Sequence, residues 1–100
     1  MPERRSISEI QEMLHQEFPS LSSRYNVSSI GLFGSYVRHE QRDESDLDVL
    51  VEFDETPSLL KFIELENHLS DLLGIQVDLV MKDALKPRVR PRIMDEIVMI

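Results

Sequence analysis

The sequence contains no cysteine, so the chain can form neither disulfides nor thiolate metal sites. It also has no apolar run near the ~20 residues that span a bilayer. The first residues, MPERRSIS, lack the apolar core of a signal peptide. These absences are compatible with a reducing compartment, and we expect a cytoplasmic protein with no membrane contact.

Basic residues are scarce: 11 lysines and arginines stand against 19 acidic residues, for a formal net charge of −8. This balance argues against direct nucleic-acid binding through general phosphate neutralisation. The charge is unevenly spread, because residues 42–55 hold seven carboxylates and one arginine, whereas residues 82–92 hold five basic groups and one aspartate. The acidic segment suits a cation. The basic segment suits phosphates or an acidic partner surface, or is a solvated face.

The length of 100 residues predicts one domain, spanning residues 1–100. Capping and periodicity predict a helix over about 7–17, disturbed at Pro19, and a second helix from Thr56-Pro57 to Gly74. Strands are expected over 27–33, 46–53 and 76–80, with a short helix over about 35–40 and helical turns near the end. The expected stripe of the second helix is Leu59, Phe62, Ile63, Leu69, Leu72 and Leu73. This order indicates an α+β fold with a small mixed sheet flanked by helices.

Two carboxylates stand at the head of the second predicted strand. Asp46 and Asp48 are two residues apart, so their side chains leave one face of the strand with roughly 6.6 Å between their Cα atoms. At an effective dielectric near 20 they repel by roughly 3 kcal/mol, which gives the fold no stability unless a cation lies between them. Hard oxygen ligands without nearby histidine or cysteine favour Mg²⁺, or Mn²⁺, over zinc. Asp78, on a neighbouring strand, could add a third carboxylate.

A glycine and a serine precede the acidic pair. Gly34 lies where a strand turns toward the predicted short helix, so backbone N–H groups there could approach an anion. Ser35 could add a hydroxyl donor. A site of this kind would hold a nucleoside triphosphate by its outer phosphates, with a carboxylate-bound metal at the reacting phosphorus.

Gly34-Ser35, ten residues, and then Asp46-Leu47-Asp48 match the GS-x10-D-x-D signature of polymerase-β-type nucleotidyltransferases. More narrowly, FGSYVRHEQRDESDLDVLVEF resembles the minimal nucleotidyltransferase (MNT) antitoxins of the MntA type. VDLV at 77–80 and KDALKP at 82–87 are also typical of these proteins. The resemblance covers about residues 27–96, which we take as the core of the domain.

The resemblance implies transfer of AMP from ATP to a tyrosine hydroxyl of a HEPN-type ribonuclease toxin, as in type VII-like toxin–antitoxin pairs. It further implies that Asp46 and Asp48 hold two Mg²⁺ ions, that Asp78 completes the second metal shell and can take the acceptor proton, and that the Gly34-Ser35 amides meet the charge of the leaving pyrophosphate.

Other residues of the motif leave alternatives open. Arg38 matches an arginine common after the Gly-Ser of the family, and either approaches the triphosphate or pairs with Asp43, Glu44 or Asp46 to brace the loop. Ser45 binds a phosphate or orients Asp46, or only caps a turn. His39 replaces a frequent glycine, which puts the path of the loop in question. Tyr36 either stacks on a base or packs the predicted short helix.

Two other functions remain open from the sequence. The same fold could neutralise its partner by binding and occlusion, with carboxylates that no longer act. It could also modify RNA or a small molecule. The intact Gly-Ser and three aspartates argue against the first alternative, and the acidic balance and small size argue against RNA.

Overall fold

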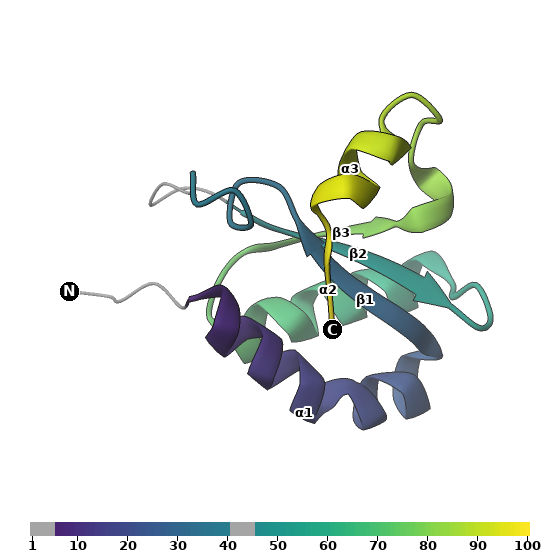
Figure 1. Ribbon diagram of the computed structural model, residues 1–100. Helices are drawn as coiled ribbons and strands as arrows, with labels where there is room; N and C mark the ends of the chain where they lie inside the picture. The colour runs from purple at the N-terminus through teal and green to yellow at the C-terminus, as the bar shows by residue number, and fades with distance from the viewer. Residues whose placement is uncertain (1–5, 41–45) are drawn as a thin grey trace.

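A four-stranded mixed sheet organises the computed structural model, which describes residues 6–40 and 46–100 (Figure 1). The strands are β1 (Val27–Phe33), β2 (Leu47–Phe53), β3 (Val77–Met81) and β4 (Val98–Met99), in the spatial order β3-β2-β1-β4. β1 runs antiparallel to β2 and β4, whereas β2 and β3 are parallel. A parallel pair needs a crossover connection, and a helix supplies it here. The predicted α+β fold with a mixed sheet is confirmed.

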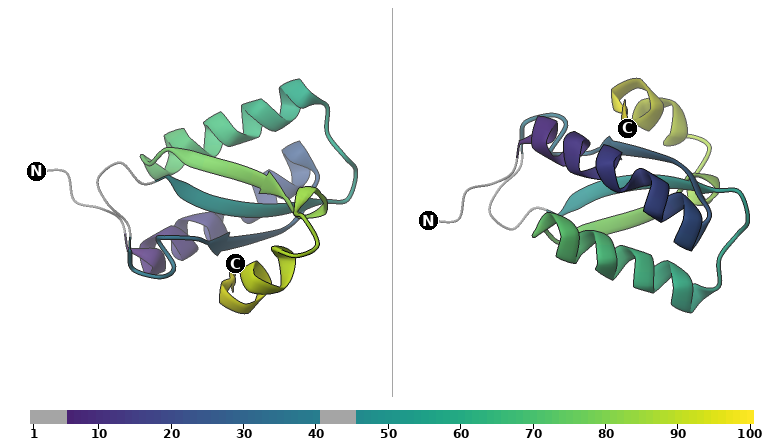
Figure 2. Two further views of the ribbon diagram at one scale, coloured as in Figure 1. Left: turned by 90° about the horizontal axis from the view of Figure 1, so that it is seen from above. Right: turned by 90° about the horizontal axis from the view of Figure 1, so that it is seen from below.

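Helices cover the two faces of this sheet unequally. α1 (Ile7–Tyr25) and α2 (Leu59–Leu73) lie on one face, while α3 (Arg90–Glu96) lies on the other (Figures 1 and 2). Side chains of β2 alternate between these faces. Leu47, Val49 and Val51 enter the main core with both long helices, and Leu50 joins Phe33 and Ile93 in a smaller cluster under α3. Asp48, between Leu47 and Val49, therefore faces the α3 side.

The first helix is longer than predicted. It was expected to end near residue 17, yet α1 continues through Pro19 to Tyr25. Proline removes one backbone hydrogen bond inside a helix. The two residues that follow it at helical spacing, Leu21 and Tyr25, are buried in the main core, so packing favours continuation. Asn26 then ends the helix in the left-handed conformation at φ 60°.

The second helix starts later than predicted, and its stripe is confirmed only in part: Leu69 and Leu73 are buried as expected. Its N-cap is Ser58, whose Oγ accepts from the Lys61 N–H at 3.2 Å, so Thr56-Pro57 lies outside the helix. Leu59 is 74% exposed and Ile63 43% exposed, contrary to the predicted stripe. The residues that α2 fully buries are Leu65, Leu69 and Leu73. Gly74 closes the helix as predicted, at φ 68°.

The C-terminal segment forms both a helix and a strand. After α3, Val98 and Met99 pair with β1 as the edge strand β4. Val98 and Ile100 pack against the main core, while Met99 is exposed, so the apolar ending serves mainly as core. No helix among residues 6–40 and 46–100 is long and apolar enough to cross a membrane.

Candidate active site

The strand register brings two of the three predicted carboxylates side by side. Asp48 of β2 lies directly opposite Asp78 of the parallel strand β3. Both side chains therefore leave the same sheet face, the one that carries α3, and the negative charge of Asp78 acts on the Asp48 carboxyl. Asp46 lies just before β2, is exposed, and acts on Asp48 through its charge.

The electrostatics of this group are dominated by Asp48. Partial burial, together with the negative charges of Asp78 and Asp46, raises the pKa of this carboxyl from 3.8 to about 6, and burial is the largest cause. The positive charge of Arg38 acts weakly in the opposite direction. A half-buried Asp48 carboxylate close to the charges of Asp78 and Asp46 does not stabilise the folded state. The arrangement instead suits a bound cation.

Gly34 packs directly on this carboxylate. Phe33 at the end of β1 pairs with Asp48, so the next residue turns over the Asp48 side chain. A Cβ atom at Gly34 would overlap Asp48 Oδ2 and lie 2.9 Å from its Cγ. The backbone there also has φ 84°, a left-handed conformation that glycine adopts without strain. The sequence analysis expected a turn at Gly34. The structure shows in addition that the Asp48 carboxylate occupies the space that a side chain at this position would need.

The predicted short helix over 35–40 is wrong, because the segment forms consecutive turns. The Gly34 carbonyl accepts from the N–H groups of Val37 and Arg38 at 3.1 and 3.2 Å, and the Ser35 carbonyl accepts from the Glu40 N–H at 2.8 Å. His39 has φ 59°, which ends any helical run and is the conformation that a glycine would adopt readily. Tyr36 is buried in the main core, so it packs inward and is not placed to stack on a base.

Arg38 is held by partners that the sequence did not suggest. Its Nε donates to Glu40 Oε2 at 3.2 Å, and its Nη1 donates to both carboxylate oxygens of Glu96, at 3.2 and 3.1 Å. The expected pairing with Asp46 is not formed. The alternatives Asp43 and Glu44 lie outside the described residues, as does Ser45. Glu96 is 58 residues away in sequence, so no local pattern could identify it.

The donor set fits Mg²⁺ without forming a complete cage. Among the described residues, no group of three histidine, cysteine, aspartate or glutamate side chains is already arranged around one point. Mg²⁺ is commonly held by one or two carboxylates together with phosphates of the substrate, and keeps several waters. Asp48 and Asp78, paired across adjacent strands, and exposed Asp46 just before β2 offer oxygen ligands of that kind.

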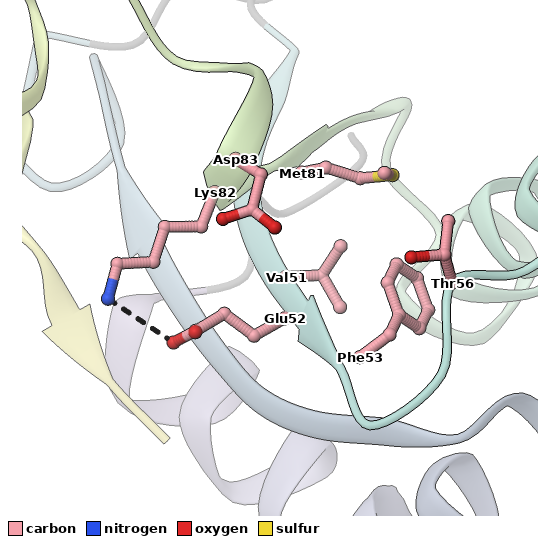
Figure 3. Close-up of a pocket in the computed structure, with 7 residues that line it drawn as sticks. All are labelled: Val51, Glu52, Phe53, Thr56, Met81, Lys82 and Asp83. Carbon is pink, nitrogen blue, oxygen red and sulfur yellow. Dashed lines mark hydrogen bonds and ion pairs between the residues drawn. The ribbon is translucent and has the colours of Figure 1, made fainter. Parts of the chain in front are cut away.

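A surface hollow lies elsewhere on the sheet. A pocket of about 50 Å³ lies at the far end of β2. Figure 3 shows the residues that line it: Val51, Glu52, Phe53, Thr56, Met81, Lys82 and Asp83. Lys82 Nζ lies 3.4 Å from Glu52 Oε1, and the same oxygen accepts from Ser29 Oγ at 3.0 Å. Lys82, the first residue of the basic segment, is thus paired away from the aspartates. The carboxylate cluster occupies the open, α3-bearing face at the start of β2 instead.

Comparisons with known proteins give a consistent result. Residues 12–100 match the family model described as nucleotidyltransferase domain. The chain is 50% identical over 93 residues to the protein adenylyltransferase MntA of Thermococcus cleftensis, covering 93% of this chain and 94% of that protein. A solved minimal nucleotidyltransferase structure superposes with a TM-score of 0.79 at 33% identity, covering 97% of this chain and 98% of the other. A toxin–antitoxin crystal structure with AMP-PNP superposes with a TM-score of 0.66 at 26% identity, covering 90% of this chain and 68% of the other.

Proposed function

The chain belongs to the nucleotidyltransferase domain family, and from this premise we propose that it is a protein adenylyltransferase acting as an antitoxin. Support comes from its 50% identity to MntA of Thermococcus cleftensis over nearly the full length of both chains. A related chain occurs in a toxin–antitoxin structure with AMP-PNP, which points to ATP as the nucleotide. The proposed acceptor is a tyrosine hydroxyl of a HEPN-type toxin encoded beside this chain, and the proposed setting is the cytoplasm.

The single observation that carries this proposal is the pairing of Asp48 with Asp78 under Gly34. It gathers carboxylates in register on adjacent strands, directly beside the Gly34-Ser35 turn. Asp46, Asp48 and Asp78 would hold Mg²⁺. When bound, the metal would neutralise triphosphate charge and lower the pKa of the acceptor hydroxyl.

The protein groups would act around the α-phosphorus of ATP. The tyrosine oxygen attacks that phosphorus, the new O–P bond forms as the bond to the β-phosphate oxygen breaks, and pyrophosphate leaves in line. The acceptor proton passes to Asp78, which is exposed at the cluster. Gly34, Ser35 and Arg38 are proposed to bind the triphosphate: the backbone N–H groups of Gly34 and Ser35 donate toward the developing charge, and the Arg38 guanidinium binds the phosphates in the ground state and transition state alike. Ser45 is assigned a phosphate contact on the sequence motif alone.

The test is transfer of label from α-³²P-ATP, with Mg²⁺, to the product of the neighbouring gene. We expect label on the partner with the wild-type chain. Asp48→Asn should reduce the rate by about 100-fold or more, because the loss of a metal ligand removes several kcal/mol of transition-state stabilisation. Asp71→Asn is the matched control, since it removes the same charge from an exposed residue of α2, on the sheet face opposite the one that carries the cluster (Figure 1).

Three results would distinguish the alternatives. Label that persists in Asp48→Asn contradicts the catalytic assignment. Neutralisation of the toxin without any label supports binding and occlusion. Label on RNA or on a small molecule, with none on the partner protein, supports a different acceptor.

A further inference from the structure

The strongest long-range polar contact beside the cluster joins the Gly-Ser turn to α3. Arg38 Nη1 lies 3.2 and 3.1 Å from the two carboxylate oxygens of Glu96, so both oxygens accept hydrogen bonds from the same guanidinium nitrogen. The Glu96 side chain is only 21% exposed, against 63% for Glu40, the other partner. Glu96 therefore offers the better-shielded and more firmly placed of the two contacts.

Glu96 owes its place to the packing of α3. Ile93, one turn earlier, is buried with Phe33 and Leu50 in the smaller cluster on the sheet face that also carries Asp48. The Ile97 N–H donates to the Ile93 carbonyl at 2.9 Å and closes the helix directly after Glu96. The carboxylate of Glu96 is thus tied, through Ile93, to the same sheet residues that flank Asp48.

The Arg38 guanidinium lies within electrostatic reach of the cluster without bonding to it. Its charge lowers the pKa of Asp48, yet its hydrogen bonds within the described part of the chain go to Glu40 and Glu96. A guanidinium released beside three carboxylates would be drawn onto them, because bidentate pairs with carboxylates are its strongest contacts. Such a pair would fill the space for the metal. It would also remove a cation from the path of the triphosphate.

We propose that Glu96 is a positioning residue that holds Arg38 off the aspartate cluster and presents its guanidinium to the triphosphate of ATP. The inference rests on the proposed function, because it assumes that ATP is the ligand of this face. Among the described residues, Nη2 of Arg38 has no acceptor, so its two N–H groups can donate to phosphate oxygens while Nε and Nη1 stay clasped.

The experiment measures the Kd of AMP-PNP with Mg²⁺ for the full chain without partner, and separately KM and kcat for transfer. Glu96→Gln should raise the Kd and the KM by about tenfold and leave kcat nearly unchanged, because Arg38 binds ground state and transition state alike. Asp95→Asn is the control: it removes the same charge from α3 at an exposed neighbour that forms no side-chain hydrogen bond or ion pair with residues 6–40 or 46–100, and it should leave both values unchanged.

A double mutant separates positioning from a general structural effect. If Glu96 acts only through Arg38, Glu96→Gln should weaken AMP-PNP binding no further in an Arg38→Ala background. Equal weakening in both backgrounds, or a wild-type Kd for Glu96→Gln, would overturn the inference. If Glu96→Gln does not fold, Glu96→Asp keeps the charge on a shorter side chain. It should weaken binding in the wild-type background and not in Arg38→Ala.

The proposed function can fail independently of this inference. A wild-type chain that binds AMP-PNP but labels no partner would contradict protein adenylylation. The effect of Glu96→Gln on nucleotide binding would still decide the role of Glu96. A wild-type chain that does not bind AMP-PNP would overturn both.

Discussion

At the scale of single residues, Gly34 and Asp48 form one unit. The glycine contributes a left-handed backbone that lets β1 turn away, and the absence of a side chain leaves room for the Asp48 carboxylate. The motif spacing predicted that the two residues belong to one site. It did not reveal that they touch, since this contact arises from the pairing of Phe33 with Asp48 between β1 and β2.

Gly34→Ala should be more harmful than its backbone conformation alone explains. We expect it to lower the free energy of unfolding by about 2–4 kcal/mol and to abolish transfer, because the methyl group adds a collision with Asp48 to the strain of positive φ. Gly74→Ala is the control, with φ 68° and no atom within 4 Å of an added Cβ, and should lower it by only about 1 kcal/mol. Denaturant unfolding of both variants measures the difference, and equal losses would contradict the assigned contact.

At the scale of elements, α2 does more than cross between two parallel strands. The Glu66 carboxylate accepts from the Leu79 N–H at 2.9 Å, and Ser70 Oγ accepts from the Val77 N–H at 3.0 Å. Both donors belong to the edge strand β3, whose outer N–H groups would otherwise be unpaired. Since Asp78 lies between the two capped residues, these bonds also hold the register that sets it beside Asp48.

Glu66→Ala should therefore destabilise the protein although Glu66 is a polar residue on a helix surface. We expect a loss of about 1–2 kcal/mol in the free energy of unfolding, because the Leu79 N–H loses a charged acceptor. Its neighbour Asn67 is exposed, and its side chain forms no hydrogen bond with residues 6–40 or 46–100. Asn67→Ala should therefore change the free energy of unfolding by less than about 0.5 kcal/mol. Urea unfolding of the two variants tests this, and an unchanged midpoint for Glu66→Ala would show that the cap contributes nothing.

At the scale of the whole molecule, the raised pKa of Asp48 should make the free energy of unfolding depend on pH. Because the pKa of Asp48 is about 6 in the folded chain and near 3.8 when unfolded, the folded state binds more protons between these values. The contribution of Asp48 to stability is therefore most favourable below about pH 4 and falls as the pH rises to about 6. Above that pH the unfavourable contribution is constant.

The comparison that isolates this effect is wild type against Asp48→Asn. We expect the variant to gain stability relative to wild type as the pH rises from 4 to 7, measured by urea unfolding without metal at each pH. Addition of Mg²⁺ at pH 7 should stabilise the wild type more than the variant, because a bound cation relieves the repulsion. A stability difference that does not change with pH would contradict the raised pKa.

The sequence alone predicted the α+β class, the strands at which the aspartates lie and the Gly-Ser turn beside them. These features depend on period-two alternation, caps and motif spacing, which are local properties of the chain. It misjudged the end of α1, part of the α2 stripe and the helix over 35–40, because burial of Leu21 and Tyr25, exposure of Leu59 and the φ of His39 depend on distant neighbours. The pairing of Asp48 with Asp78 and the contact of Glu96 with Arg38 could not be predicted from the sequence. They join residues 30 and 58 positions apart and arise from strand register and helix packing, which no local pattern specifies.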